Sequence, residues 1–148
     1  MIPKTLVWWS ILISVTLAVS IVRPMGVAGD DKKAVMDAAA QFYGALNVLF
    51  TGEVGPMREV WSHAADVTYM GPGGDFRVGW DQVLASWKEQ AAMKLGGTVR
   101  SDNMHVAVGH DLAVAHNVET GENVKDGQVL KVSIRATNVF RKEAASGR

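Results

Sequence analysis

The side chains of this chain that most readily hold a metal ion are four histidines: His63, His105, His110 and His116. A zinc site needs three or four converging ligands, commonly with two histidines spaced to share one helix face. The four histidines lack such a spacing, because His63 falls at a predicted helix end, His110 in a predicted turn and the others on predicted strands. The sequence therefore predicts no metal site, and nothing in it indicates another cofactor.

His116 lies between Val114 and Val118 on a predicted strand face that is otherwise apolar. Its imidazole could therefore point into a pocket. The alternative is a hydrogen-bonded histidine in the core or at an interface, and we favour it because such positions are the more common use of a histidine among apolar residues.

Asp66 is the carboxylate whose position best suits general acid–base chemistry, since it comes directly before an apolar strand segment. In the alternative interpretation Asp66 is structural and ends the segment 61–65, which is a common use of aspartate in turns. We favour the structural role.

Aromatic side chains form a large set for a domain of this size: Trp61, Tyr69, Trp80 and Trp87. Aromatics at helical spacing most often fill a core, and Trp80 with Trp87 fits that pattern. Tyr43 and Tyr69 could instead line a cavity, because each offers a flat ring with a hydroxyl group at its tip.

Arg135 lies in the middle of a predicted strand and could bind a ligand carboxylate. A cross-strand pair with Glu119 or Glu122 is the simpler interpretation. The glycine-rich segment 71–74 lacks the Gly-Lys-Ser/Thr ending of a phosphate-binding loop and is predicted to be a hairpin turn. No Gly-x-Ser-x-Gly nucleophile pattern occurs.

The elements that position these side chains begin with helices. Asp30-Asp31 is predicted to cap a first helix, which ends at Thr51-Gly52. Pro56 is typical of the first turn of a short second helix. The remaining elements of this half are strands at 67–70 and 76–78 and a third helix from Trp80 to Ala91, before Gly96-Gly97.

From Thr98 onward the hydrophobic period changes to two, which predicts antiparallel strands at 99–108, 112–120 and 129–141. Asp126-Gly127 is typical of a two-residue hairpin before the last strand. On that strand one face carries Ile134, Ala136, Asn138 and Phe140, and the other carries Ser133, Arg135, Thr137, Val139 and Arg141. Helices followed by such strands indicate an α+β domain.

Residues 1–28 are typical of a secretory signal. The apolar run 6–22 follows Lys4 and precedes Arg23-Pro24, and residues 26–28 are small enough for signal-peptidase cleavage. An uncleaved membrane anchor is the alternative. Both predict an exported domain, periplasmic or secreted.

Residues 30–148 are predicted to form one domain. Without cysteine there is no disulfide framework, and a formal net charge of zero argues against nucleic acid or an anionic membrane surface as a partner. We expect membrane contact only through the N-terminal segment, if it stays uncleaved.

Three stretches of the domain carry a family resemblance: residues 42–47, 61–80 and 133–142. They resemble the SnoaL-like branch of the nuclear transport factor 2-like superfamily, and the resemblance covers residues 31–142. It implies a cone-shaped, cystatin-like roll with three helices packed on a curved antiparallel sheet. Relatives include ketosteroid isomerases, polyketide cyclases, dehydratases and noncatalytic binding or dimerisation domains, so the resemblance does not select one activity. Homodimers are common among them.

The isomerases among these relatives use a carboxylate base and two donors to an oxyanion. By position, the base falls on Gly71 and the donors on Phe42 and Asn138. Tyr43 is one residue further and therefore rotated by about 100° around the helix. Because glycine replaces the base, we do not expect steroid isomerisation, and Asn138 remains a candidate polar group of the pocket.

The resemblance also implies one more strand than this chain supplies after Arg141. In relatives that strand lies between the strand ending near Arg141 and the short N-terminal hairpin. Its absence would leave backbone groups without a ladder partner and open the pocket wall. We therefore expect a truncated gene product or a gap in the sheet, not a complete six-stranded sheet.

Taken together, these observations favour an exported domain that binds a small, mostly apolar molecule in a cone-shaped pocket. Two alternatives remain, an acid–base enzyme of the cyclase, isomerase or dehydratase type and a noncatalytic homodimerisation module. The candidate pocket residues are Phe42, Tyr43, Trp61, Tyr69, Trp87, His116 and Asn138.

Overall fold

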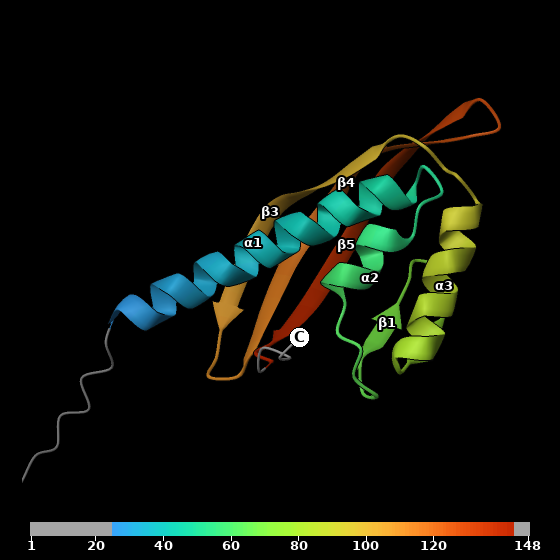
Figure 1. Cartoon of the computed structure of the whole chain (residues 1–148). Coiled ribbons are helices and arrows are strands. Elements are labelled where there is room, and N and C mark those ends of the chain that lie inside the picture. Colours follow the sequence, from blue (N-terminus) through green and yellow to red (C-terminus); the bar gives the residue numbers. More distant parts are fainter. Residues whose placement is uncertain (1–24, 144–148) are drawn as a thin grey trace, which may run out of the picture.

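The structure is a computed structural model in which residues 25–143 are described (Figure 1). Three helices and five strands follow one another along the chain: α1 (Met25–Leu49), α2 (Gly55–Val60), β1 (Thr68–Met70), β2 (Phe76–Val78), α3 (Trp80–Ala92), β3 (Thr98–Val108), β4 (Leu112–Lys125) and β5 (Gln128–Arg141). This is the predicted α+β architecture. The predicted signal or anchor segment 6–22 lies outside the described residues.

The predicted start of α1 is wrong. The helix begins at Met25 and includes residues 26–28, where we predicted cleavage. Asp31 therefore lies inside the helix instead of capping it, and its carboxylate accepts a hydrogen bond from Lys142 Nζ at 2.7 Å. Among the described residues, no helix is both long enough and apolar enough to cross a membrane.

The three-stranded sheet has the order β3-β4-β5 and is antiparallel throughout. Asp126-Gly127 forms the predicted two-residue turn, with φ values of 52° and 76°. Because the turn is this tight, Lys125 pairs directly with Gln128. β4 therefore continues beyond the predicted end at Thr120, as far as Lys125.

Helix α1 runs diagonally across one face of this sheet, with α2 beside it and α3 next to the β1–β2 hairpin (Figure 1). We call the face under α1 the inner face. The largest side chains that are fully buried are Leu49, Met57, Val83 and Trp87. They lie between the helices and the sheet and form the main core. A smaller core of Val35, Val106, Ala113 and Ala115 lies under the N-terminal half of α1.

The β1–β2 hairpin forms a sheet of its own. Within residues 25–143 no strand joins it to β5, which agrees with the expected gap. On β5 the inner side chains are therefore only half-buried, while the alternate ones are exposed.

Asn47 fixes α1 to the start of β3. Its Nδ2 donates to the Val99 carbonyl at 3.0 Å, and its Oδ1 accepts from the Val99 N–H at 2.8 Å. An asparagine side chain thereby replaces a strand partner for Val99, a residue with 3% exposure.

We predict that Asn47→Ala destabilises the domain by about 1–3 kcal/mol, because it leaves a buried N–H and a buried carbonyl of Val99 unpaired. Urea unfolding followed by tryptophan fluorescence would measure this loss. Thr51→Ala is the control, since the Thr51 hydroxyl bonds an exposed helix end. Equal stability of the two variants would contradict the prediction.

Candidate functional site

A group of polar side chains lies on the inner face between α1 and the sheet. Asn117 Nδ2 donates to the Tyr43 hydroxyl oxygen at 2.7 Å, and that hydroxyl donates to Glu119 Oε1 at 3.2 Å. Asn138 on β5 lies beside the same hydroxyl and favours its ionised form. We call Tyr43, Asn117, Glu119 and Asn138 the polar cluster.

The burial of this cluster controls its protonation. Desolvation raises the pKa of Tyr43 to about 12, although the hydrogen bond from Asn117 acts in the opposite direction. Desolvation also raises the pKa of the Glu119 carboxyl, and the hydrogen bond from Tyr43 partly offsets this effect. The Tyr43 hydroxyl therefore stays protonated at neutral pH, next to a carboxyl group that holds its proton more tightly than an exposed glutamate does.

Two amide atoms of the polar cluster are buried without a hydrogen-bond partner within the described residues, Asn117 Oδ1 and Asn138 Nδ2. The orientation of Asn117 follows from its neighbours. An ionised Glu119 can only accept, so Tyr43 must donate to it and accept from the Asn117 amino group. The carbonyl oxygen of Asn117 is thereby left without a donor, while the Asn138 side chain lies close enough to the Tyr43 hydroxyl to lower its pKa.

Aromatic rings form a wall next to the polar cluster. Trp87 lies 4.3 Å from Tyr69 and 5.4 Å from Trp61, measured between ring centroids, and Phe42 contacts Tyr43 edge-on at 5.1 Å. These distances are typical of favourable aromatic pairs. The Tyr69 hydroxyl accepts a hydrogen bond from Gln90 Nε2 at 3.0 Å, which holds its ring against α3.

A cavity of about 180 Å³ lies further along the inner face, between the N-terminal half of α1, the β3–β4 turn and the end of β5. Its walls are mostly apolar and include Val35, Ala38, Ala113 and Phe140. Ala113 and Asn117 lie on the same side of β4, separated by the buried Ala115. The cavity and the polar cluster therefore lie on the same face of the sheet, with the packed Ala115 between them, and no residue of the cluster lines the cavity.

A larger cleft, of about 490 Å³, lies at the other end of the sheet. Its charged side chains are satisfied by neighbours, since Lys131 pairs with Glu122 and Arg100 pairs with Asp102. Such exposed pairs usually have a structural role, so we do not assign the cleft a function.

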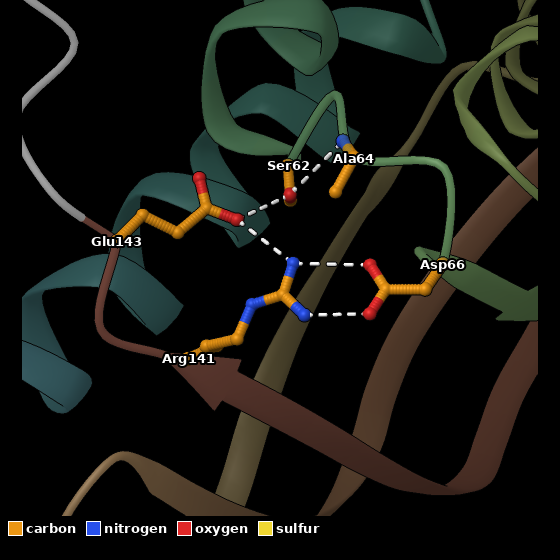
Figure 2. Close-up of polar contacts among 5 residues, drawn as sticks. All are labelled: Ser62, Ala64, Asp66, Arg141 and Glu143. Carbon is orange, nitrogen blue, oxygen red and sulfur yellow. Dashed lines mark hydrogen bonds and ion pairs between the residues drawn. The ribbon is translucent and has the colours of Figure 1, made fainter.

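Arg141 at the end of β5 forms a clasp with the loop before β1 (Figure 2). Its guanidinium donates to both carboxylate oxygens of Asp66, at 2.7 and 3.1 Å, and to Glu143, which accepts from the Ser62 hydroxyl. These bonds hold the pKa of Asp66 below its usual range. They tie the loop before β1 to the end of β5, at the gap that the described residues leave between the two sheets.

Six of the seven predicted pocket residues lie together in or beside the main core, and none of them lines the 180 Å³ cavity: Phe42, Tyr43, Trp61, Tyr69, Trp87 and Asn138. The placement of His116 in a pocket is wrong. Its side chain is exposed on the outer face of the sheet, which is the face opposite α1. There His116 Nδ1 lies 3.1 Å from the Thr137 hydroxyl.

The other polar residues singled out in the sequence are structural or exposed. Asp66 is structural as favoured: it lies in the turn before β1, and its carboxylate pairs with Arg141. The predicted partners of Arg135 are wrong, because Glu119 bonds Tyr43 and Glu122 bonds Lys131.

No histidine or aspartate among the described residues reaches the inner site. The surroundings of His63 and Gly71 illustrate the reason. The exposed His63 stacks on Trp80 at 4.2 Å. A Cβ atom at Gly71, where relatives carry the base, would lie only 2.7 Å from the Tyr69 hydroxyl. A larger residue at 71 would therefore have to displace Tyr69 from this wall. Within residues 25–143 no group of three potential metal ligands occurs.

Sequence reasoning missed Asn117 and Glu119, although a signal for both was present. A two-residue turn at Asp126-Gly127 fixes which residues oppose each other, and it places Asn117 opposite Ala136 and Glu119 opposite Ile134. Opposed residues of an antiparallel pair share a face. Since Ala136 and Ile134 were already placed with Asn138, the hairpin predicts all three polar residues on one face.

A family model for the SnoaL-like domain matches residues 35–146. The chain belongs to the SnoaL-like family. Comparison with curated proteins finds no match. SnoaL-like domains and their structural relatives share the fold described above, so family membership explains the scaffold and leaves the activity open.

Three solved structures illustrate the likeness. A nuclear transport factor 2-like superfamily protein from Salmonella enterica serovar Typhimurium has a TM-score of 0.70 and 15% identity, covering 80% of this chain and 84% of that one. A candidate dehydratase from Streptomyces avermitilis has a TM-score of 0.65 and 24% identity, covering 76% and 86%. A candidate ketosteroid isomerase from Shewanella frigidimarina has a TM-score of 0.59 and 20% identity, covering 75% and 85%. At these identities the likeness supports the fold alone.

We predict that Glu119→Gln stabilises the domain at about pH 7 and has little effect at about pH 4. The raised pKa means that folding favours protonated Glu119, so its contribution to stability is lost as the pH rises through the folded-state pKa. Glutamine removes that loss and can still accept from Tyr43. Urea unfolding at both pH values, with Glu122→Gln as an exposed control on the same strand, would measure the effect. A Glu119→Gln variant less stable than the wild type at neutral pH would show that the carboxylate, not the acid, is the form that folding favours.

Proposed function

We propose that this SnoaL-like domain binds a small, mostly apolar molecule on the inner face of its sheet. The apolar part of the ligand occupies the 180 Å³ cavity, and its polar end contacts the charged side chains at the cavity's border. The observation that carries the proposal is an apolar cavity bordered by a few charged groups, Asp31, Arg141 and Lys142. Binding sites typically pair an apolar lining with a few fixed polar groups in this way.

The size of the cavity limits the ligand. A volume of 180 Å³ is smaller than the roughly 300 to 1,000 Å³ typical of sites for drug-sized molecules. We therefore expect a ligand of one or two rings or a short chain.

Acid–base catalysis is the second candidate function, and Glu119 is the observation in its favour. Its raised pKa brings the carboxyl closer to the range in which an acid or base works at neutral pH, and the Tyr43 hydroxyl lies within 3.2 Å. In the structure the two groups bond each other, so a substrate would have to displace that bond before reacting. Binding is therefore the simpler proposal.

We also propose that the chain forms a homodimer, in which a second copy binds through the outer face. It is the sheet face opposite α1, and it carries exposed apolar side chains, with Leu112 at 53% and Val139 at 65% exposure. An antiparallel sheet face with exposed apolar side chains suits the self-complementary contact of a two-fold dimer. We further propose that the domain is exported, on the basis of residues 1–28.

We predict that Ala38→Leu, which fills the cavity, weakens ligand binding by about tenfold or more and leaves the domain folded. Native mass spectrometry of the full chain, followed by denaturation, would reveal a bound molecule and its loss in the variant. Ala40→Leu is the matched control, because Ala40 is exposed on the same helix. Unchanged retention of ligand in Ala38→Leu would contradict binding in this cavity.

For the dimer, we predict that Val139→Glu shifts the protein to a monomer, because it places a charge within the proposed outer-face contact. The masses seen in native mass spectrometry at several protein concentrations would show the shift. Lys131→Glu, also on β5 but near the hairpin end, is the control and should stay dimeric. A wild-type chain that is monomeric throughout would refute the dimer.

A further inference from the structure

We propose that His105 and His116 bind a zinc ion together with the same two histidines of a second copy of the chain. This inference goes beyond the proposed ligand binding, and it rests on the proposed homodimer only for the second pair of ligands. It begins with the pairing of the two histidines across the β3–β4 ladder.

An irregularity in β3 brings the two histidines onto one face of the sheet. Asp102 is paired with Val118. The next ladder pair is His105 with His116, although two residues of β3 and only one of β4 lie between the two pairs. This is a β-bulge, and Asn103 within it has a positive φ of 55°. Without the extra residue, the alternation of side chains along β3 would turn His105 to the inner face.

Both histidines are exposed, and both lie on the outer face. Opposed residues of an antiparallel pair have Cβ atoms about 4.5–5.5 Å apart, which allows two imidazoles to reach one metal ion. Imidazole nitrogen is among the preferred ligands of zinc. Spacing along the chain does not reveal this pair, which is why the sequence alone predicts no metal site.

Thr137 on β5 orients one of the two rings. It lies opposite His116 in the β4–β5 ladder, and His116 Nδ1 lies 3.1 Å from its hydroxyl oxygen. When Nδ1–H donates to that oxygen, the free lone pair of the imidazole is on Nε2, at the end of the ring farthest from the backbone. Histidines that bind metal ions usually donate the other ring N–H to a neighbouring oxygen in this manner. The Thr137 hydroxyl is therefore placed to hold His116 in its metal-binding form.

One chain supplies only half of a zinc coordination shell. Zinc normally takes four ligands in a tetrahedral arrangement, and within residues 25–143 no third potential ligand joins the pair. A two-fold axis through the pair brings the same two histidines of a second copy to the ion, because the two surfaces of such a contact are identical. The ladder pair Val114 and Val139 lies next to the histidines on the same face and would be covered by the same contact.

Zinc titration of the full chain tests this inference. The protein is prepared without a polyhistidine tag, and its metal is removed with EDTA before zinc ions alone are added. Native mass spectrometry would give the number of zinc ions per chain, and calorimetry their affinity. We expect one zinc ion for two chains, and a dissociation constant of the dimer that falls by about tenfold or more when zinc is added.

The His105→Ala variant checks the ligands. It removes two of the four imidazoles of a dimer, so we expect zinc binding to weaken by about a hundredfold or more, beyond the loss typical for a residue that only orients a ligand. His110→Ala is the matched control and should leave zinc affinity unchanged, because His110 is an exposed histidine in the turn after β3 that bonds Asp111.

The orienting role of Thr137 has a test of its own. Thr137→Val keeps the size of the side chain and removes the hydroxyl, so we expect roughly tenfold weaker zinc binding. Thr137→Ser keeps the hydroxyl and should bind zinc as the wild type does. Equal affinities of these two variants would contradict the orienting role.

The outcomes separate the metal site from the proposals made above. Absence of zinc binding, or equal losses in His105→Ala and His110→Ala, would overturn the site. One zinc ion per chain with no change in the dimer would show that each copy binds metal alone, and would overturn the shared site. A dimer that forms equally well without zinc would leave the homodimer proposal intact, whereas a chain that stays monomeric with zinc bound would count against the homodimer as well.

Discussion

The tight turn at Asp126-Gly127 is the constraint on which the inner site depends. Both residues adopt positive φ, which a two-residue turn of this kind requires, and the turn fixes the pairing of β4 with β5 along 14 residues. A slip of β5 by one residue would move each of its side chains to the opposite face, while β4 stays fixed by its pairing with β3. Asn138 would then face outward and leave the Tyr43 hydroxyl.

Much of this architecture could be predicted from the sequence. The predicted positions of α2, α3, β1 and β2 agree with the structure. Pro56 and the glycines at 71–74 mark the limits of these elements, because such residues determine the local backbone conformation. The predicted start of α1 was wrong, because an acidic pair can either cap a helix or lie within one. Here the contact of Asp31 with Lys142 distinguishes the two cases. That contact joins residues 111 positions apart, beyond the reach of a local pattern.

The site was less predictable than the fold. The aromatic residues and Asn138 do lie together around Tyr43, although none of them lines the cavity. His116 was placed on the wrong face because its valine neighbours suggested burial. Those valines lie on the outer face, which the helices do not cover. Which face of a strand is buried depends on where the helices pack, and the strand's own sequence does not show this. Glu119 was overlooked as a functional group because glutamate in a strand usually faces solvent. Its role becomes visible only when Tyr43 and the sheet are brought together.

The open side of β5 has a consequence for the behaviour of the protein in concentrated solution. Within residues 25–143 no strand pairs with this edge, so its backbone N–H and C=O groups offer a template for edge-to-edge association of chains. Charged side chains such as Lys131 and Arg135 along the strand are a common natural defence against such association. The clasp between Arg141 and Asp66 adds a second defence, because it covers one end of the same edge with the loop before β1. Neutralising these charges would therefore reduce solubility before it reduced the stability of the fold.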